Sequence, residues 1–149
     1  MFFQHYSLKR IKNLFFLSLA NLPMPGHKVR PWIVRLGGVD IKNPSSCFIG
    51  KDVDFDTVAP QRIHIGERCA ITVGTRILTH YKNPRTGRWY VGDVNIGNKV
   101  FIGANTIITK NVSIGDNVII GAGSIVTKDI PSKEVWAGNP AKCIGKVGY

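Results

Sequence analysis

His80 is the side chain of this sequence best placed for acid–base chemistry. It lies in the segment 78–90, which is rich in polar and aromatic residues and interrupts an otherwise regular pattern. The imidazole of histidine has an ordinary pKa of about 6.5, so it can take a proton from a hydroxyl group at neutral pH. These properties predict a general base at His80.

Three carboxylates could accompany this histidine. Asp54 and Asp56 flank Phe55, and Asp93 follows the interrupted segment. If Phe55 points into a core, the alternation of side chains along a strand turns both flanking carboxylates outward. The sequence leaves the partner of His80 open among them.

A six-residue repeat must position these groups. One aliphatic residue recurs in every hexad, and in the second half of the chain each is followed four places later by a small or β-branched residue. The members of the second half are Ile96, Ile102, Ile108, Ile114, Ile120 and Val126, and the earlier ones are Ile65, Ile71 and Ile77, with Ile49 and Phe55 continuing the pattern more weakly. Ile96 follows Ile77 by nineteen positions, one more than three hexads, which predicts a protruding loop at about 78–93.

This period is typical of short strands separated by corners. Gly and Asn give the corners their backbone freedom, and β-branched residues favour the flat faces. Three faces complete one triangular coil of about eighteen residues, and stacked coils pair their strands in parallel around an aliphatic column. We therefore predict an all-β parallel β-helix over 45–149, preceded by an N-terminal segment, 1–44.

The run Val118–Pro131, together with Ala137–Lys142, resembles the C-terminal signature of the hexapeptide-repeat acyltransferases. The resemblance is closest to the sugar O-acetyltransferases, which include the maltose and galactoside enzymes and relatives that acetylate capsular or O-antigen polysaccharides. It implies a left-handed β-helix, a homotrimer with active sites between subunits, and acetyl-CoA as the acyl donor. The implied reaction is direct acetylation of a saccharide hydroxyl in cell-surface polysaccharide biosynthesis, with His80 as the base.

The resemblance also implies binding residues. Asp54 matches a position that contacts the acceptor or steadies the histidine. Ala104 and Ala122, eighteen residues apart, would stack and leave room for the pantetheine arm. Thr127 and Lys128 match a pair near the adenosine end of the donor. Lys142 stands where the family commonly has an arginine, which would lose bidentate phosphate contact.

Composition and charge set further limits. The chain has 149 residues and a formal net charge of +11, which invites a nucleic-acid interpretation, but the repeat carries no recognised nucleic-acid motif. Hydrophobic residues spaced as in a helix before Pro23, with basic neighbours, predict an amphipathic helix that caps the β-helix or contacts an anionic membrane surface. Three cysteines without metal-ligand spacing predict reduced thiols and therefore a cytoplasmic protein. Within the cytoplasm, the protein could also lie at the inner face of the membrane.

Other functions remain open at this stage. The acceptor could be an amine, such as an amino sugar, instead of a hydroxyl. An inactive trimeric scaffold is disfavoured by the presence of His80. A zinc enzyme like the gamma-class carbonic anhydrases needs three protein ligands, whereas the repeat offers only His64 and His80, so we predict no metal.

Overall fold

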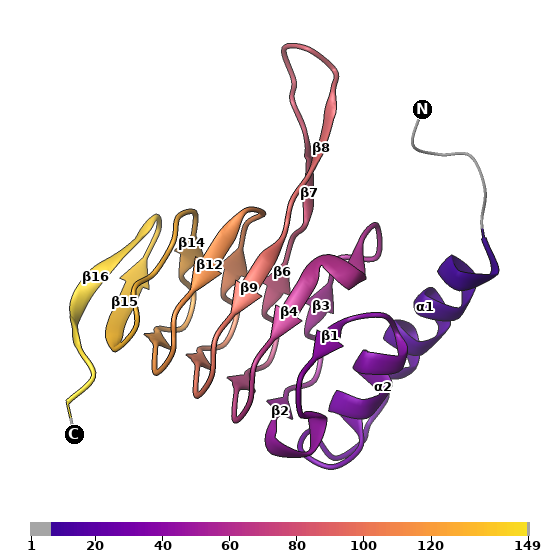
Figure 1. The fold of residues 1–149 in the computed structure, drawn as a ribbon, viewed down its shortest axis with the longest axis horizontal. Coiled ribbons are helices and arrows are strands. Elements are labelled where there is room, and N and C mark those ends of the chain that lie inside the picture. Colours follow the sequence, from indigo (N-terminus) through magenta and orange to yellow (C-terminus); the bar gives the residue numbers. More distant parts are fainter. Residues whose placement is uncertain (1–6, 149) are drawn as a thin grey trace.

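Stacked triangular coils form the body of the protein, as Figure 1 shows for the computed structural model, which describes residues 7–148. Each coil contributes one short strand to each of three parallel sheets. Sheet A contains β1 (Asp40–Ile41), β4 (Ile63–Ile65), β9 (Val94–Ile96) and β12 (Val112–Ile114). Sheet C contains β3 (Asp54–Phe55), β6 (Arg76–Ile77), β11 (Ile107–Ile108) and β14 (Ile125–Val126).

Sheet B is also parallel except for its last strand, which closes the C-terminal end of the body. Its strands are β2 (Phe48–Ile49), β5 (Ala70–Ile71), β10 (Phe101–Ile102), β13 (Ile119–Ile120), β15 (Glu134–Gly138) and β16 (Ala141–Lys146). The last strand, β16, pairs with β15 in the antiparallel direction. The coils begin at Asp40, earlier than the predicted start at residue 45, because β1 pairs with β4.

The core is the aliphatic column that the repeat predicts. All the repeat residues from Ile49 to Val126 are buried, and so are the small residues four places later, such as Thr106 and Ser124. Asn105, Asn111 and Asn117 turn corners with φ near 57°, a conformation that asparagine tolerates. The sequence pattern thus translates directly into one inward side chain per face.

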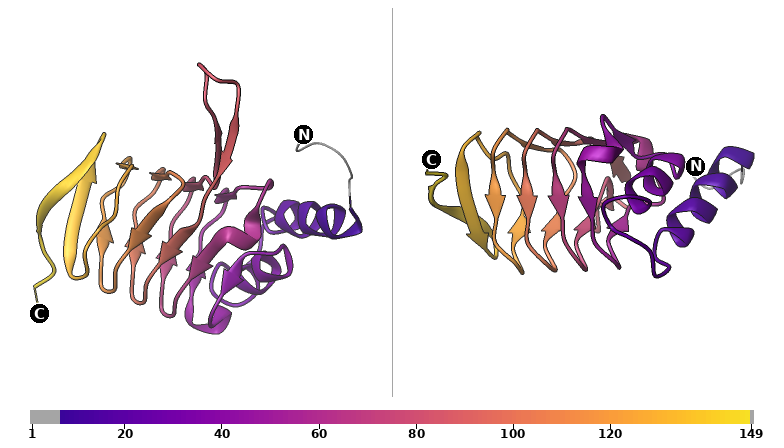
Figure 2. Two further views of the ribbon diagram at one scale, coloured as in Figure 1. Left: turned by 45° about the horizontal axis from the view of Figure 1, so that its top comes forward. Right: turned by 90° about the horizontal axis from the view of Figure 1, so that it is seen from below.

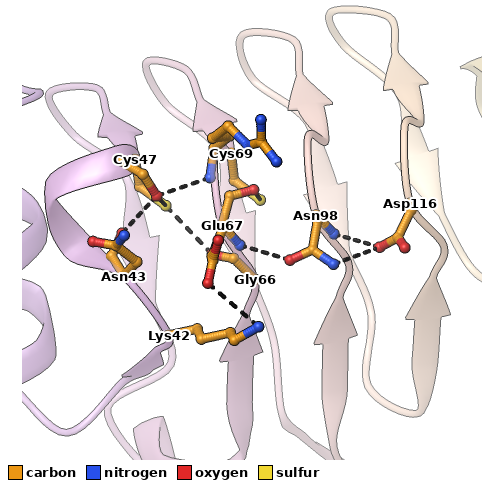
Figure 3. Close-up of polar contacts among 10 residues, drawn as sticks. Lys42, Asn43, Cys47, Gly66, Glu67, Cys69, Asn98 and Asp116 are labelled. Carbon is orange, nitrogen blue, oxygen red and sulfur yellow. Dashed lines mark hydrogen bonds and ion pairs between the residues drawn. The ribbon is translucent and has the colours of Figure 1, made fainter.

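Polar side chains link successive coils at the corner between sheets A and B (Figure 3). The backbone N–H of Glu67 donates to Asn98 Oδ1 at 3.0 Å, and that of Asn98 donates to Asp116 Oδ1 at 2.6 Å. Each side chain therefore satisfies a corner N–H of the preceding coil. Cys47 and Cys69 are buried beside this corner as free thiols.

Two helices lie at the N-terminal end, α1 (Leu8–Leu19) and α2 (Arg30–Leu36) (Figures 1 and 2). The buried Arg30 side chain donates to four backbone carbonyl groups, those of Ala20, Leu22, Met24 and Ile49, at 2.7–3.3 Å. It thereby ties the segment after α1 to strand β2. Of the predicted N-terminal segment 1–44, residues 1–6 lie outside the described part of the chain.

The interrupted segment is a two-stranded antiparallel hairpin instead of an irregular loop. Strands β7 (His80–Lys82) and β8 (Trp89–Val91) stand out from the side of the coils, between β6 and β9 (Figures 1 and 2). His80 is the first residue of the hairpin, so it sits where the projecting element meets the body.

Candidate active site

Asp56 and His80 form a close pair at the corner between sheets C and A. His80 Nδ1 lies 2.5 Å from Asp56 Oδ2. The His80 side chain is 25% exposed, whereas that of Asp56 is 2% exposed. A buried carboxylate thus holds one nitrogen of a ring that solvent can reach.

The local backbone places Asp56 inward. Strand β3 ends at Phe55, and the Asp56 N–H then donates to the Ile77 carbonyl of the next coil at 3.1 Å. The carboxylate accepts hydrogen bonds from Thr79 N and Thr79 Oγ1, both at 2.7 Å, and from Val58 N at 2.9 Å. Its position is therefore fixed in part by Thr79, the residue that precedes the hairpin.

These contacts also decide the charge of Asp56. Burial alone would raise the pKa of Asp56, but the hydrogen bonds from Val58, Thr79 and His80 together hold it below its ordinary value. The ionised carboxylate can only accept, so His80 donates through Nδ1–H. Its Nε2 is left with a lone pair, the arrangement that a general base requires.

The other predicted carboxylates lie elsewhere. Asp54 is exposed, with Oδ2 3.9 Å from Arg76 Nε, and Asp93 lies 3.2 Å from Arg62 Nη1. The expectation that both residues flanking Phe55 point outward is wrong for Asp56, because the strand ends there and the chain turns. As a substrate-binding residue, Asp54 stays a prediction.

Asp56 was not singled out from the sequence among the three carboxylates, although the sequence contains a signal for it. Asp56, Leu78, Thr109 and Thr127 each follow the inward residue of a sheet C strand, and the N–H groups of the first three donate to the next coil, at the carbonyls of Ile77, Ile108 and Val126. A charged residue at a position that otherwise holds Leu or Thr indicates that another residue hydrogen-bonds its carboxylate.

A cavity of about 390 Å³ opens beside the histidine. Its lining residues are Leu78, His80, Tyr81, Thr109, Lys110 and Thr127. A larger hollow of about 510 Å³ lies over sheet A, where His64 Nδ1 bonds Asp40 Oδ2 at 2.9 Å. Because the Asp56–His80 pair opens onto the smaller cavity, we place the chemistry there.

Comparison with known proteins fits this geometry. Residues 93–128 match the model of the bacterial transferase hexapeptide family (six repeats). Protein CapG of Staphylococcus aureus is 37% identical over 141 residues, which cover 89% of this chain and 77% of that protein. The chain belongs to the bacterial hexapeptide transferases. The predicted fold, a left-handed parallel β-helix of hexapeptide repeats, and the predicted acyltransferase class are confirmed.

Two solved structures of hexapeptide transferases are similar over nearly the whole chain. A maltose O-acetyltransferase from Clostridium difficile 630 is 29% identical, with a TM-score of 0.68, and the match covers 95% of this chain and 87% of that one. A galactoside acetyltransferase in complex with coenzyme A is 25% identical, with a TM-score of 0.65 and coverage of 94% and 81%.

The predicted donor residues of this hexapeptide transferase lie at two corners. Ala104 and Ala122 stack at the corner between sheets B and C, where Gly123 N donates to Ala104 O at 2.7 Å. Gly103 permits this approach, because a Cβ there would lie 2.4 Å from Ala122 N. Thr127 lies at the opposite edge of sheet C and lines the His80 cavity. The width of sheet C therefore separates the two alanines from His80.

The two predicted lysines lie toward the C-terminal end and are exposed. Lys128 Nζ is 5.3 Å from the centre of the Trp136 ring, and Lys142 lies in β16. Within residues 7–148, no helix is both long and apolar enough to cross a bilayer. In the same part of the chain, no three His, Cys, Asp or Glu side chains form a group that could hold a metal ion.

Proposed function

We propose that this hexapeptide transferase is an acetyl-CoA-dependent O-acetyltransferase that acts on a saccharide hydroxyl in cell-surface polysaccharide biosynthesis. The observation that carries the proposal is the buried Asp56 carboxylate on His80 Nδ1, which leaves His80 Nε2 free to accept a proton. Similarity to the maltose and galactoside enzymes supports the acetyl donor and the sugar acceptor.

His80 serves twice in the proposed reaction. Its Nε2 takes the proton of the acceptor hydroxyl while the oxygen attacks the thioester carbonyl carbon and forms the new C–O bond. The C–S bond then breaks, and the imidazolium returns the proton to the departing CoA thiolate. No covalent enzyme intermediate forms. Removing such a base typically lowers the rate by about 10²–10⁴-fold.

The donor would bind along the stacked alanines. The small side chains of Ala104 and Ala122 leave the backbone accessible to a narrow pantetheine arm. Lys128 and Lys142 are proposed toward the adenosine end, where cations suit the phosphates. Thr127 is proposed to contact the donor as well; because it lines the His80 cavity, its contact would lie near the reacting groups. The galactoside acetyltransferase, solved with coenzyme A, supports a CoA site on this fold.

We further propose a homotrimer whose active sites lie between subunits. The outward residues of sheet B form an apolar row in register, made of Phe48, Ala70, Phe101, Ile119 and Val135. The Phe48, Phe101 and Ile119 side chains are 37–45% exposed in the single chain, which favours their burial in an interface. Because sheet C separates His80 from the two alanines, His80 of one subunit would act on donor held by the next.

Helix α1 supports a peripheral contact with the inner face of the membrane from a cytoplasmic location. Leu8, Ile11 and Phe15 are exposed on it, with Lys9 and Lys12 beside them. Apolar side chains flanked by cations are the composition that anionic bilayer surfaces bind. The free thiols of Cys47, Cys69 and Cys143 are consistent with the reducing cytoplasm.

An acceptor panel tests the proposed function. Acetyl-CoA consumption is measured with neutral sugars, acidic oligosaccharides, nucleotide-linked sugars and amines, using the wild type and His80→Ala. We expect turnover with a saccharide and a loss of about 10²–10⁴-fold in the variant. Equal turnover by both proteins would remove His80 from the mechanism, and turnover with amines alone would replace O-acetylation by N-acetylation.

A further inference from the structure

We propose that the β7–β8 hairpin is the acceptor-binding element and that it selects an acidic glycan. This inference rests on the proposed function, because it names the acceptor class of the same site. It is carried by the aromatic and charged side chains of the hairpin and by their position relative to His80.

One face of the hairpin places an aromatic ring beside the base. In the β7–β8 register, His80 lies opposite Val91 and Lys82 lies opposite Trp89. The rings of His80 and Trp89 have centroids 5.5 Å apart with planes at 36°, and Lys82 Nζ is 5.8 Å from the centre of the Trp89 ring. Trp89 is 39% exposed although it is the largest apolar group beside the base.

The opposite face repeats this combination of rings and cations. Tyr81 and Tyr90 stack at 5.1 Å and are both exposed, and Lys110 Nζ from the body lies 4.4 Å from the centre of the Tyr81 ring. An isolated two-stranded hairpin is marginally stable in water, so ring-to-ring contacts of this kind help to hold it. The stacked rings thus help to hold the two strands of the hairpin together.

The hairpin is strongly basic and carries no acid. The segment 78–92 contains Lys82, Arg85 and Arg88 and no Asp or Glu. Among residues 7–148, none of these three cations lies in an ion pair. At the tip, Asn83 Oδ1 accepts from the N–H groups of Arg85 and Thr86, at 2.9 and 3.2 Å, and so fixes the turn from which the arginines project.

These features together fit an anionic sugar chain. A pyranose ring presents a face of C–H groups that packs on an aromatic ring, and Trp89 offers such a ring next to His80. Carboxylate or phosphate groups on neighbouring sugars would meet Arg85 and Arg88, whose guanidinium groups bind either anion bidentately. The glycan would lie along the hairpin with one hydroxyl at His80 Nε2.

Direct binding tests the proposal without turnover. The wild type, without acetyl-CoA, is titrated by calorimetry with a uronic-acid oligosaccharide, a phosphodiester-linked oligosaccharide and a neutral one of equal length. We expect an acidic chain to bind at least about tenfold more tightly than the neutral one, and salt to weaken its binding. The two acidic arms tell carboxylate from phosphate recognition, and equal binding of all three chains overturns the proposal.

Variants locate the contact. Arg85→Gln/Arg88→Gln is expected to raise the Kd of the acidic chain about tenfold and to leave the neutral chain unchanged, whereas Trp89→Ala weakens both. Lys28→Gln/Arg35→Gln removes the same charge from the N-terminal segment and should change neither. If the hairpin variants raise only the KM for acetyl-CoA, the cations serve the donor and the proposal fails. Binding of the acidic chain without turnover on any acceptor would refute the proposed function and leave only the binding of an acidic glycan by the hairpin.

Discussion

Replacing Asp56 with Asn tests how the buried carboxylate serves His80. The change keeps the shape of the side chain and removes its negative charge. Asp56 Oδ2 faces both Thr79 and His80 Nδ1, whereas Oδ1 accepts from Val58 N. An amide nitrogen in the place of Oδ2 would donate to His80 Nδ1, which favours the tautomer with its proton on Nε2. That tautomer cannot act as the base.

The expected loss follows from the charge that develops on His80. When the imidazole accepts a proton, its positive charge lies about 4 Å from the carboxylate charge, which is worth about 4 kcal/mol at an effective dielectric constant of about 20. His80 is 25% exposed, so solvent screens part of this attraction. We therefore expect a loss of about 2–4 kcal/mol, or about 30- to 1,000-fold in kcat.

The assay follows thioester absorbance, and kcat is determined separately from the KM of donor and acceptor. A positioning role predicts a lower kcat at nearly constant KM. Asp93→Asn is the matched control, since Asp93 pairs with Arg62 and should not affect kcat. Thermal melts check that both variants fold. If folded Asp56→Asn turns over as fast as the wild type, the charge of Asp56 has no part in catalysis.

Three further predictions follow from other contacts. Because its pKa is held below the ordinary value, Asp56 contributes stability above about pH 4 that is lost as pH falls through the folded pKa. Below that pH, the melting temperature of the wild type should therefore fall more steeply than that of Asp56→Asn. Parallel curves for the two proteins would contradict this. Arg30→Met leaves four carbonyl groups without their donor and should lower the free energy of unfolding, measured in urea, by about 3 kcal/mol. Arg30→Lys should recover little of this loss, since an ammonium group cannot match the several N–H donors of the planar guanidinium group. Ala122→Leu fills the proposed donor groove and should raise the KM for acetyl-CoA about tenfold with the acceptor KM unchanged, so an unchanged donor KM would place the pantetheine elsewhere.

The repeat predicts the fold well because its signal is periodic. A buried Ile or Val every sixth residue leaves one arrangement that buries all of them, and the structure buries each one. His80 could be singled out for the complementary reason, since it stands where that regularity ends. The nineteen-position spacing from Ile77 to Ile96 marks the insertion.

The partner of His80 could not be predicted in the same way. Alternation holds within a strand, and β3 is only two residues long, so the rule fails one residue beyond it. Whether Asp54 or Asp56 turns inward depends on where Thr79 lies, one coil away. The sequence likewise shows the hairpin only as an interruption of the repeat. The pairing of Tyr81 with Tyr90 is a contact between side chains, which leaves no periodic pattern in the sequence.

The two ends of the coil stack have a consequence for the solution behaviour of the protein. Parallel coils pair only with their neighbours, so nothing within the repeat limits how many can stack. The edge of β2 is occupied by the Gly26 carbonyl, which accepts from Ile49 N at 2.8 Å, and by Arg30 on the Ile49 carbonyl. At the other end the chain reverses into β16. A chain stripped of its first helices would expose open strand edges and could polymerise end to end into fibres. The N-terminal segment and β16 therefore limit the stack of coils to its present length.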